Sequence, residues 1–361
     1  MTIQRHYLDQ LMLSLHDKEA AYDAGPAGWT AASACSMLEF DDASAHEEWD
    51  DGLAANDDVV NQEFATRQEI ARQGLRINYS EPRAKPNSMA GLMGLALGTV
   101  VSVQEAALVA YRHKITPAAP AVLPSIAAQT KHEGGAQYKY TGIKGDGYSL
   151  GINGPYMNFN CPLIGSGSRV TAADAFAAAK SENWLRWGDA KIFVKPTSGT
   201  AITIPADPVQ GAVNLGASNV ELSTRVLNGF AHAWVNALQG DDGYRASGGK
   251  ARKVLYPGRR NGTITLPLEV DSASEATELD YYLSQTKLAF EFNLNSGEII
   301  AATGAYKFGV IIVVPLIQFR TIGRTTENEK EVLTFEGKIM DDGTNDEIVA
   351  WVYNAVAAYL A

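Results

Sequence analysis

The chain has 361 residues, of which 46% are hydrophobic, so it is long enough for two domains and can bury a large core. Its formal net charge of −11 argues against tight nucleic-acid binding, because phosphate contacts require clustered Lys and Arg. The two cysteines, Cys35 and Cys161, are too few for a disulfide framework or a cysteine metal site.

The N-terminal segment predicts no export signal. Residues 1–25 have no long apolar run, and the longest such run, 308–317, is about half the length of a membrane helix. We therefore expect a soluble protein, made in a cytoplasm and not inserted in a membrane. The stretch from Glu39 to Asp58 follows, with nine acidic residues and no Lys or Arg. It is interpreted as a solvated loop or, alternatively, as a negative patch facing a partner or a lumen.

A short helix between two strands is expected next. Residues 74–81 and 99–113 have strand composition, and residues 86–98 have apolar residues at helical spacing. Gly98 is a plausible end for this helix. Residues 138–152 then predict a strand, a tight Gly-Asp-Gly turn and a second strand. The inner positions of the helix are Met89, Leu92, Met93 and Ala96.

The second half shows a similar order of elements. An Asn-Gly turn at 261–262 precedes a predicted strand, and residues 271–285 predict a helix with a capping box. Residues 287–294 and 304–319 predict further strands. The box is formed by Ser272 and Glu275, and the expected inner face of the helix by Ala276, Leu279, Tyr282 and Leu283.

This order suggests an internal duplication, although strand patterns also recur by chance. The resulting division is an N-terminal arm with an acidic loop (1–60), a first module (61–185) and a second module (186–361). The C-terminal segment predicts a strand up to Tyr353, followed by a tail that packs separately.

The most regular strand pattern lies at residues 332–343, where apolar and polar residues alternate before an acidic turn. A period of two predicts a strand with one buried and one wet face. The candidate core residues are Leu333, Phe335 and Ile339. The residues of the wet face are Thr334, Glu336 and Lys338.

No motif predicts catalysis or a cofactor. The glycines at 165–169 lack the Lys of a phosphate loop, and the six histidines lack the helical spacing of a zinc site. The carboxylates at 341–347 do not follow calcium-loop spacing, so a turn is favoured over weak calcium binding. We therefore expect no enzyme activity, no cofactor and no metal, and this absence favours a structural protein.

Several stretches in this order resemble the tail tube proteins, or major tail proteins, of long-tailed bacteriophages. They are "DKEAAYDAG", "MAGLMGLALGTV" with "YRHKITP" and "LPSIAAQ", "YKYTGIK" with "YSLGI", and "VLTFEGKIMDDG" with "VYNAVAAYL". The resemblance is weakest at 39–61 and 236–253. It implies a mainly β fold, a tail-tube-type β-sandwich or barrel with flanking helices, present in one or two tandem copies.

The resemblance also implies a function. Rings of this chain would stack into the hollow tail tube of the virion and conduct DNA during genome ejection, after assembly in the host cytoplasm. Thr334, Glu336 and Lys338 would then face the lumen. Partners would be further copies of the chain and the tail terminator, tip and tape-measure proteins, with double-stranded DNA passing without specific binding. A duplicated chain predicts trimeric rings and a single module predicts hexameric ones.

Two other functions remain open at this point. One is a different virion or tube component, such as a tail terminator, a decoration protein or a secretion-tube homologue. The other is a β-rich carbohydrate-binding module, which would require a cleft with converging carboxylates and aromatic platforms.

Overall fold

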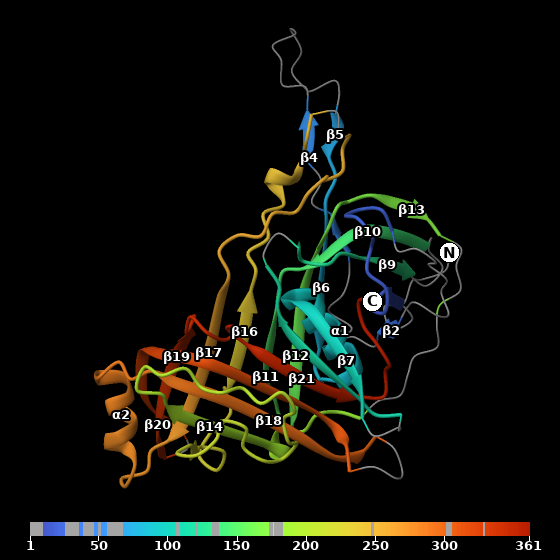
Figure 1. The fold of residues 1–361 in the computed structure, drawn as a ribbon. Helices are drawn as coiled ribbons and strands as arrows, with labels where there is room; N and C mark the ends of the chain where they lie inside the picture. The colour runs from blue at the N-terminus through green and yellow to red at the C-terminus, as the bar shows by residue number, and fades with distance from the viewer. Residues whose placement is uncertain are drawn as a thin grey trace.

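The computed structural model describes residues 10–25, 36–38, 47–49, 52–55, 68–105, 109–119, 122–131, 137–172, 176, 183–246, 249–300, 305–327 and 329–361. Within these ranges the fold is mainly β, as the sequence predicts, and its named strand pairs are antiparallel (Figure 1). None of the helices described is both long and apolar enough to cross a membrane. Most of the predicted arm, 1–60, lies outside the described residues, as does most of the acidic stretch.

The largest sheet buries one face and leaves the other toward solvent, and is named the polar-face sheet. Its strands pair in the order β3-β6-β12-β11-β16-β17-β20, and the C-terminal half of β19 continues it. The strands are β3 (Glu47–Trp49), β6 (Leu75–Glu81), β12 (Tyr156–Gly165), β11 (Gly147–Asn153), β16 (Ala231–Val235), β17 (Asn261–Glu269), β20 (Lys330–Ile339) and β19 (Lys307–Glu327).

The second sheet is buried on both faces at its centre, and is named the sealed sheet. Its order is β15-β14-β18-β19-β21-β8-β7, where β19 contributes its N-terminal half. The strands are β15 (Val220–Glu221), β14 (Ala190–Pro196), β18 (Leu288–Ile299), β21 (Val349–Asn354), β8 (Tyr111–Pro117) and β7 (Gly98–Gln104).

Residues 197–219, named the strap, cover the outer side of the sealed sheet. Ile202 and Leu215 of the strap form a second hydrophobic cluster with side chains of the sheet, including Ile311 and Trp351. Burial on both sides explains why residues 308–317 are apolar without alternation.

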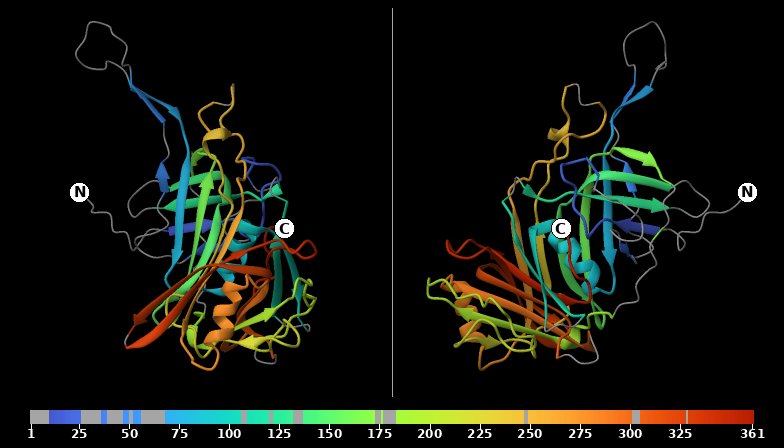
Figure 2. Two further views of the ribbon diagram at one scale, coloured as in Figure 1. Left: turned by 90° about the vertical axis from the view of Figure 1, so that its left-hand side faces the viewer. Right: turned by 45° about the vertical axis from the view of Figure 1, so that its right-hand side comes forward.

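A third, smaller sheet lies beside the other two, with strand order β2-β1-β9-β10-β13. It joins the polar-face sheet where β10 pairs with the end of β12. A separate hairpin of β4 (Gly52–Ala55) and β5 (Gln68–Arg72) projects from one end of the molecule (Figures 1 and 2). The strands of the third sheet are β2 (Ser36–Leu38), β1 (Gln10–Leu13), β9 (Ile126–Lys131), β10 (Gln137–Gly145) and β13 (Arg169–Thr171).

Strand β19 belongs to both large sheets. Its first half pairs with β18 and β21, and its second half pairs with β20. A register shift between Phe319 and Thr321 marks a bulge, and bulges bend strands. The two sheets face each other across the main core, where the ring of Phe230 stacks on that of Phe292 with 5.3 Å between centroids. The result is a sandwich with a shared strand.

Helix α1 (Pro86–Leu97) confirms the helix predicted at 86–98. Gly98 ends it with a φ of 113°, a conformation that favours glycine. Every residue of α1 except Asn87 is buried, and the helix contacts strands of all three sheets, including β8, β10 and β21. A helix that is hydrophobic all round belongs inside a core, so the predicted inner stripe describes only one of its buried sides.

Two predicted turns are wrong. β10 and β11 do not form a hairpin, because the chain leaves the third sheet after Ile143, pairs with β12 at Lys144 and Gly145, and continues in the polar-face sheet as β11 from Gly147. Gly147 has a φ of 145°, and a Cβ there would lie 2.1 Å from the carbonyl oxygen of Trp234. The Asn-Gly pair at 261–262 lies inside β17, paired with β16, and forms no turn.

The segment 99–113 is two strands and not one. β7 and β8 pair as an antiparallel hairpin, and the amide of Glu105 donates to the carbonyl of Ala110 where the chain reverses. The C-terminal strand ends close to Tyr353 as predicted. The tail does not pack separately, because Val356, Tyr359 and Leu360 join the main core cluster.

Helix α2 (Glu275–Leu283) is present, but its inner face differs from the prediction. Of the predicted inner residues, Leu279 and Tyr282 pack against the main core, whereas Ala276 is exposed and Leu283 is 73% exposed. Glu278 and Tyr281, which were not predicted, are buried. Glu278 is drawn inward because its Oε2 accepts a 2.8 Å bond from Nη2 of Arg225, which lies far away in sequence. No side-chain bond of the predicted capping box forms; Asp271 accepts from the amide of Ala273 instead.

The predicted modules, 61–185 and 186–361, share one core in the described structure. β11 pairs with β16 and β8 pairs with β21, so each module supplies strands to the sheets of the other. The internal duplication stays a prediction.

Candidate assembly and lining surface

The solvent side of the polar-face sheet consists of small and polar side chains in continuous rows. Residues that lie directly opposite in neighbouring strands share a face, so the ladder registers define these rows. The first row crosses seven strands and the second crosses six. The first is Ser80, Asn160, Ser149, Ala233, Thr263, Lys338 and Gln318, and the second is Asn158, Gly151, Ala231, Thr265, Glu336 and Thr321.

None of the residues in the two rows is buried. The row between them faces the opposite way and is buried throughout; it comprises Phe159, Leu150, His232, Ile264, Gly337 and Phe319. The sheet therefore separates a dry side from a wet side over most of its width.

The residues singled out at 332–343 take part in this alternation. Leu333 and Phe335 are 1% exposed and Ile339 is 6% exposed, on the core side. Glu336 is exposed and Lys338 half-buried, each within one of the two rows. Thr334 is half-buried opposite Pro267. Whether this side lines a lumen stays a prediction.

The sequence alone did not reveal the rest of the rows. Thr263 and Thr265 lie in a strand whose alternation is visible in the sequence, and they could have been found from it. Ser149, Ala231 and Ala233 could not, because small residues give no strong pattern. Their placement depends on strand pairing across long sequence separations.

Formal charge on the two rows is balanced. Lys338 and Glu336 are their only charged residues, whereas the whole chain carries −11. Within the two rows themselves a polyanion would meet a single cation, Lys338, which also lines a cleft with three arginines at the edge of this face.

The sheets end in strands that can accept further partners. The ladders join the described strands of the three sheets into one network, in which β3, β7 and β15 each pair with one strand only. At one end of the polar-face sheet, β3 pairs with β6 alone, and at the other, residues 318–327 of β19 pair with β20 alone among the described strands. At one end of the sealed sheet, β7 exposes Val101 at 53% and Val103 at 41%. An exposed apolar edge strand favours pairing with another chain.

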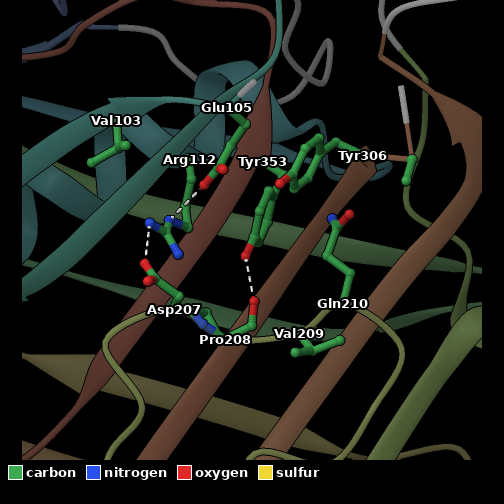
Figure 3. A pocket seen from close by; sticks show the side chains of 10 residues that line it. Val103, Glu105, Arg112, Asp207, Pro208, Val209, Gln210, Tyr306 and Tyr353 are labelled. Atoms are coloured by element: carbon green, nitrogen blue, oxygen red, sulfur yellow. Dashed lines mark hydrogen bonds and ion pairs between the residues drawn. The ribbon is translucent and has the colours of Figure 1, made fainter. Parts of the chain in front are cut away.

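A cleft of about 620 Å³ lies beside β7 (Figure 3). Arg112 lies between two carboxylates, with Nε 3.0 Å from Glu105 and Nη2 2.5 Å from Asp207. Burial opposes the charge on Arg112, but the hydrogen bond with Asp207 and the charge of Glu105 outweigh it and raise its pKa. Glu105 is thus paired in a mostly buried position, whereas the Asp207 side chain is 80% exposed and pairs with Arg112 at the surface.

The aromatic side of this cleft is also occupied by internal contacts. Tyr353 is 1% exposed, and its hydroxyl donates a 3.0 Å bond to the carbonyl of Pro208 in the strap. Tyr306 stacks on it with 6.3 Å between ring centroids. The side-chain contacts in this cleft therefore hold the strap against the sealed sheet.

The other candidate sites from the sequence do not assemble into a binding centre. Among the described residues, no group of three His, Cys, Asp or Glu side chains could hold a metal ion. At 341–347, Asp342 accepts from the amides of Thr344 and Asn345, as in a turn. At 165–169, the hydroxyls of Ser166 and Ser168 donate to Asp23.

The comparisons with known proteins give only weak likeness, and only to solved structures. No family model matches the chain. No curated protein matches it either. Among solved structures, it is similar to the Hcp1 protein of E. coli EAEC 042 pathovar, in a double-mutant form, with 13% identity, a TM-score of 0.24, and coverage of 44% of this chain and 96% of that chain. A likeness of this degree assigns no function.

Proposed function

We propose that this chain is a structural subunit whose copies assemble into rings, and that the rings stack into a hollow tube. The observation that carries the proposal is the pair of continuous polar rows on one side of the polar-face sheet, backed by a buried apolar side and bounded by strands with a partner on one side only. Joining the sheets of successive copies would remove their edges.

The size of the sheet favours several copies per ring. A barrel widens with strand number, and a barrel of eight strands is filled by its own side chains. The polar-face sheet has eight strands, counting the half of β19, so one copy cannot enclose a duplex. Head-to-tail contacts between copies close into a ring when the rotation closes. Three or six copies both remain compatible with the proposal.

The charge of the rows fits a channel for DNA. Rows with one cation and one anion would retain a polyanion less than a basic surface would, because phosphate contacts with Lys and Arg are what retain DNA. Together with the order of motifs in the sequence, this supports a more specific proposal: a tail tube protein of a long-tailed bacteriophage, located in the virion, without enzymatic activity. Thr334, Glu336 and Lys338 would face the lumen, and terminator, tip and tape-measure proteins would be its partners.

The cleft beside β7 supports a second candidate, a carbohydrate-binding module, because it brings carboxylates and tyrosines together. Sugar binding favours exposed aromatic faces and free acceptors. Here Tyr353 is buried, and Glu105 and Asp207 are paired with Arg112. The ring-forming subunit is therefore favoured.

Electron microscopy of the purified chain over rising concentration tests the proposal. We expect rings with a stain-filled centre and, at high concentration, stacks of uniform diameter. Single rings that never stack would favour a terminator-like component. A particle that stays monomeric and filled at every concentration would refute ring formation.

A further inference from the structure

A basic cleft lies where β16 ends, β17 begins and β20 ends. It has a volume of about 320 Å³, and its lining includes Trp234 and four cationic residues from separate parts of the chain. The cations are Arg259, Arg260, Arg320 and Lys338. Two carboxylates, Asp341 and Glu347, also line it, so the cleft has two more positive than negative residues in a chain of charge −11.

Arg260 lacks part of its expected set of partners. Its Nη1 donates a 2.6 Å bond to the carbonyl of Ala118, and its guanidinium lies 5.9 Å from the ring centre of Trp234. Its Nε and Nη2 are buried and have no acceptor among the described residues. Burial opposes the charge and lowers the pKa of Arg260, although Glu347 offsets part of this effect. A buried cationic donor without an acceptor is costly, so a missing acceptor is expected here.

The acidic stretch from Glu39 to Asp58 has the complementary charge, with nine carboxylates and no cation. It is attached to the fold at β3, whose backbone pairs with β6, and at the projecting hairpin of β4 and β5. β3 is the terminal strand of the polar-face sheet on the side away from β19.

Strand order places the two features at opposite ends of one sheet. Five strand spacings separate β3 from β17, which at about 4.8 Å each makes roughly 24 Å. The hairpin that follows β3 projects away from the sheet (Figure 2). In a head-to-tail ring, by contrast, the β3 end of one copy meets the β20 and β19 end of the next. β3, whose sequence includes Glu47 and Glu48 of the acidic stretch, would then lie beside the basic cleft of the neighbouring copy.

We infer that the basic cleft is an assembly site that receives carboxylates of the acidic stretch from a second copy of this chain. The inference rests on the proposed function and specifies which surfaces meet. Arg259 and Arg320 would meet opposite charge at the exposed rim, while the buried Nε and Nη2 of Arg260 add positive charge beneath it. Ion pairs of this kind set register and orientation between copies and strengthen at low salt.

Charge reversal on each side tests the inference in the full-length chain. The cleft variant carries Arg259→Glu and Arg320→Glu, which are exposed positions and should leave folding intact. The stretch variant carries Asp50→Lys and Asp51→Lys. A matched control carries Arg186→Glu and Lys287→Glu, two exposed cations outside the cleft lining. Thermal melting establishes that each protein is folded, and mass photometry gives the concentration at which rings form.

We expect each reversed variant to need at least tenfold more protein than wild type to form rings, while the control assembles like wild type. Combining all four substitutions of the cleft and stretch variants in one chain should restore assembly, because the paired charges are then exchanged on both sides. Restoration distinguishes direct pairing from general loss of solubility.

Two results would overturn the inference. The first is a folded cleft variant that forms rings at the same protein concentration as wild type. If that variant also bound DNA less well than wild type, the cleft would be a phosphate-binding site and not an assembly site. The second is a combined variant that assembles no better than its parents. In both cases wild-type rings would still support the proposed function, whereas absence of wild-type rings would refute that function first.

Discussion

The polar-face sheet and the sealed sheet share strand β19 but differ in what covers them. The sealed sheet has the main core on one side and the strap on the other, so neighbouring residues such as Ile311 and Ile312 are both 1% exposed. In the polar-face sheet, buried Phe335 is followed by exposed Glu336. The sealed sheet is covered on both sides at its centre by residues of the same chain, whereas the polar-face sheet has one wide side open to solvent.

The difference depends on which sheet has an outer cover supplied by the same chain. The strap supplies the outer cover of the sealed sheet from within the chain. No described segment covers the two polar rows. Most of their side chains are short, so this side of the sheet has a smooth surface. The sequence carries the distinction as well, since residues 308–317 are continuously apolar and residues 332–338 alternate.

Aspartate substitutions at consecutive positions should show the difference between the two sheets with the largest effect on stability. Phe335→Asp, like Leu333→Asp, should prevent folding because an unpaired charge enters the core, at a cost above about 4 kcal/mol. Thr334→Asp, on the other side of β20, should change stability by no more than roughly 0.5 kcal/mol. In the sealed sheet, Ile311→Asp and Ile312→Asp should both prevent folding. Soluble yield and circular dichroism report the outcome, and an alternating response at 311 and 312 would contradict burial on both sides.

Acid should destabilise the core through two histidines. Burial lowers the pKa of His232, beneath the polar rows, to about 4, and that of His113 likewise, although a hydrogen bond with Asn354 opposes the shift. Between pH 6.5 and about 4 the unfolded chain therefore binds protons that the folded chain does not, and stability falls as pH falls through this window. The loss should be about 3 kcal/mol for each histidine.

Urea unfolding at a series of pH values measures this loss. The free energy of unfolding should depend less steeply on pH between 6.5 and 4 in His232→Gln than in wild type, whatever the effect of the substitution on stability at pH 7. Equal slopes for variant and wild type would mean that His232 does not carry the acid sensitivity.

The sealed sheet should show a smaller effect of opposite sign. Glu291 is buried under the strap, and burial raises its pKa although Asn214 and Asn293 donate hydrogen bonds to it. The folded chain thus holds this proton at a higher pH than the unfolded chain, and the contribution of Glu291 to stability falls as pH rises above 4.5. Glu291→Gln should remove this decrease in unfolding free energy with rising pH. Glu298→Gln, at an exposed position, should leave the decrease unchanged. A slope retained in the Glu291 variant would be the contrary result.

The smallest effect is expected on the polar rows themselves. Glu336→Gln should change the free energy of unfolding by less than roughly 0.5 kcal/mol, because the carboxylate is exposed. It should also leave ring formation intact, since a charge facing solvent contributes no contact between copies. Loss of rings in this variant would move Glu336 from a lining position to an interface.

Local signals in the sequence predicted those elements whose partners are close along the chain. Helix α1 was found because its apolar spacing and the stop at Gly98 are both local. The Gly-Asp-Gly turn at 145–147 was misinterpreted because the same residues suit a hairpin and a crossing between sheets, and only the partner strands decide. The predicted inner face of α2 was right for Leu279 and Tyr282 and wrong for Ala276 and Leu283. It missed Glu278, which Arg225 draws inward.

Prediction of the candidate surfaces from the sequence was limited in the same way. The alternation at 333–338 predicted one strand of the polar face, while its neighbours are set by pairings between strands far apart in sequence. The basic cleft was missed because Arg259 and Arg260 form a single basic pair in the sequence. Arg320 and Lys338 reach them only through the ladders that join β17, β20 and β19.

The bend in β19 has a mechanical consequence. A single covalent backbone crosses from one sheet to the other at residues 319–321, so tension applied to either sheet is carried along the chain and does not depend on side-chain adhesion between the layers. Pulling on the molecule by its sheets should therefore give one rupture event and not two, with the bulge as the point where the load turns.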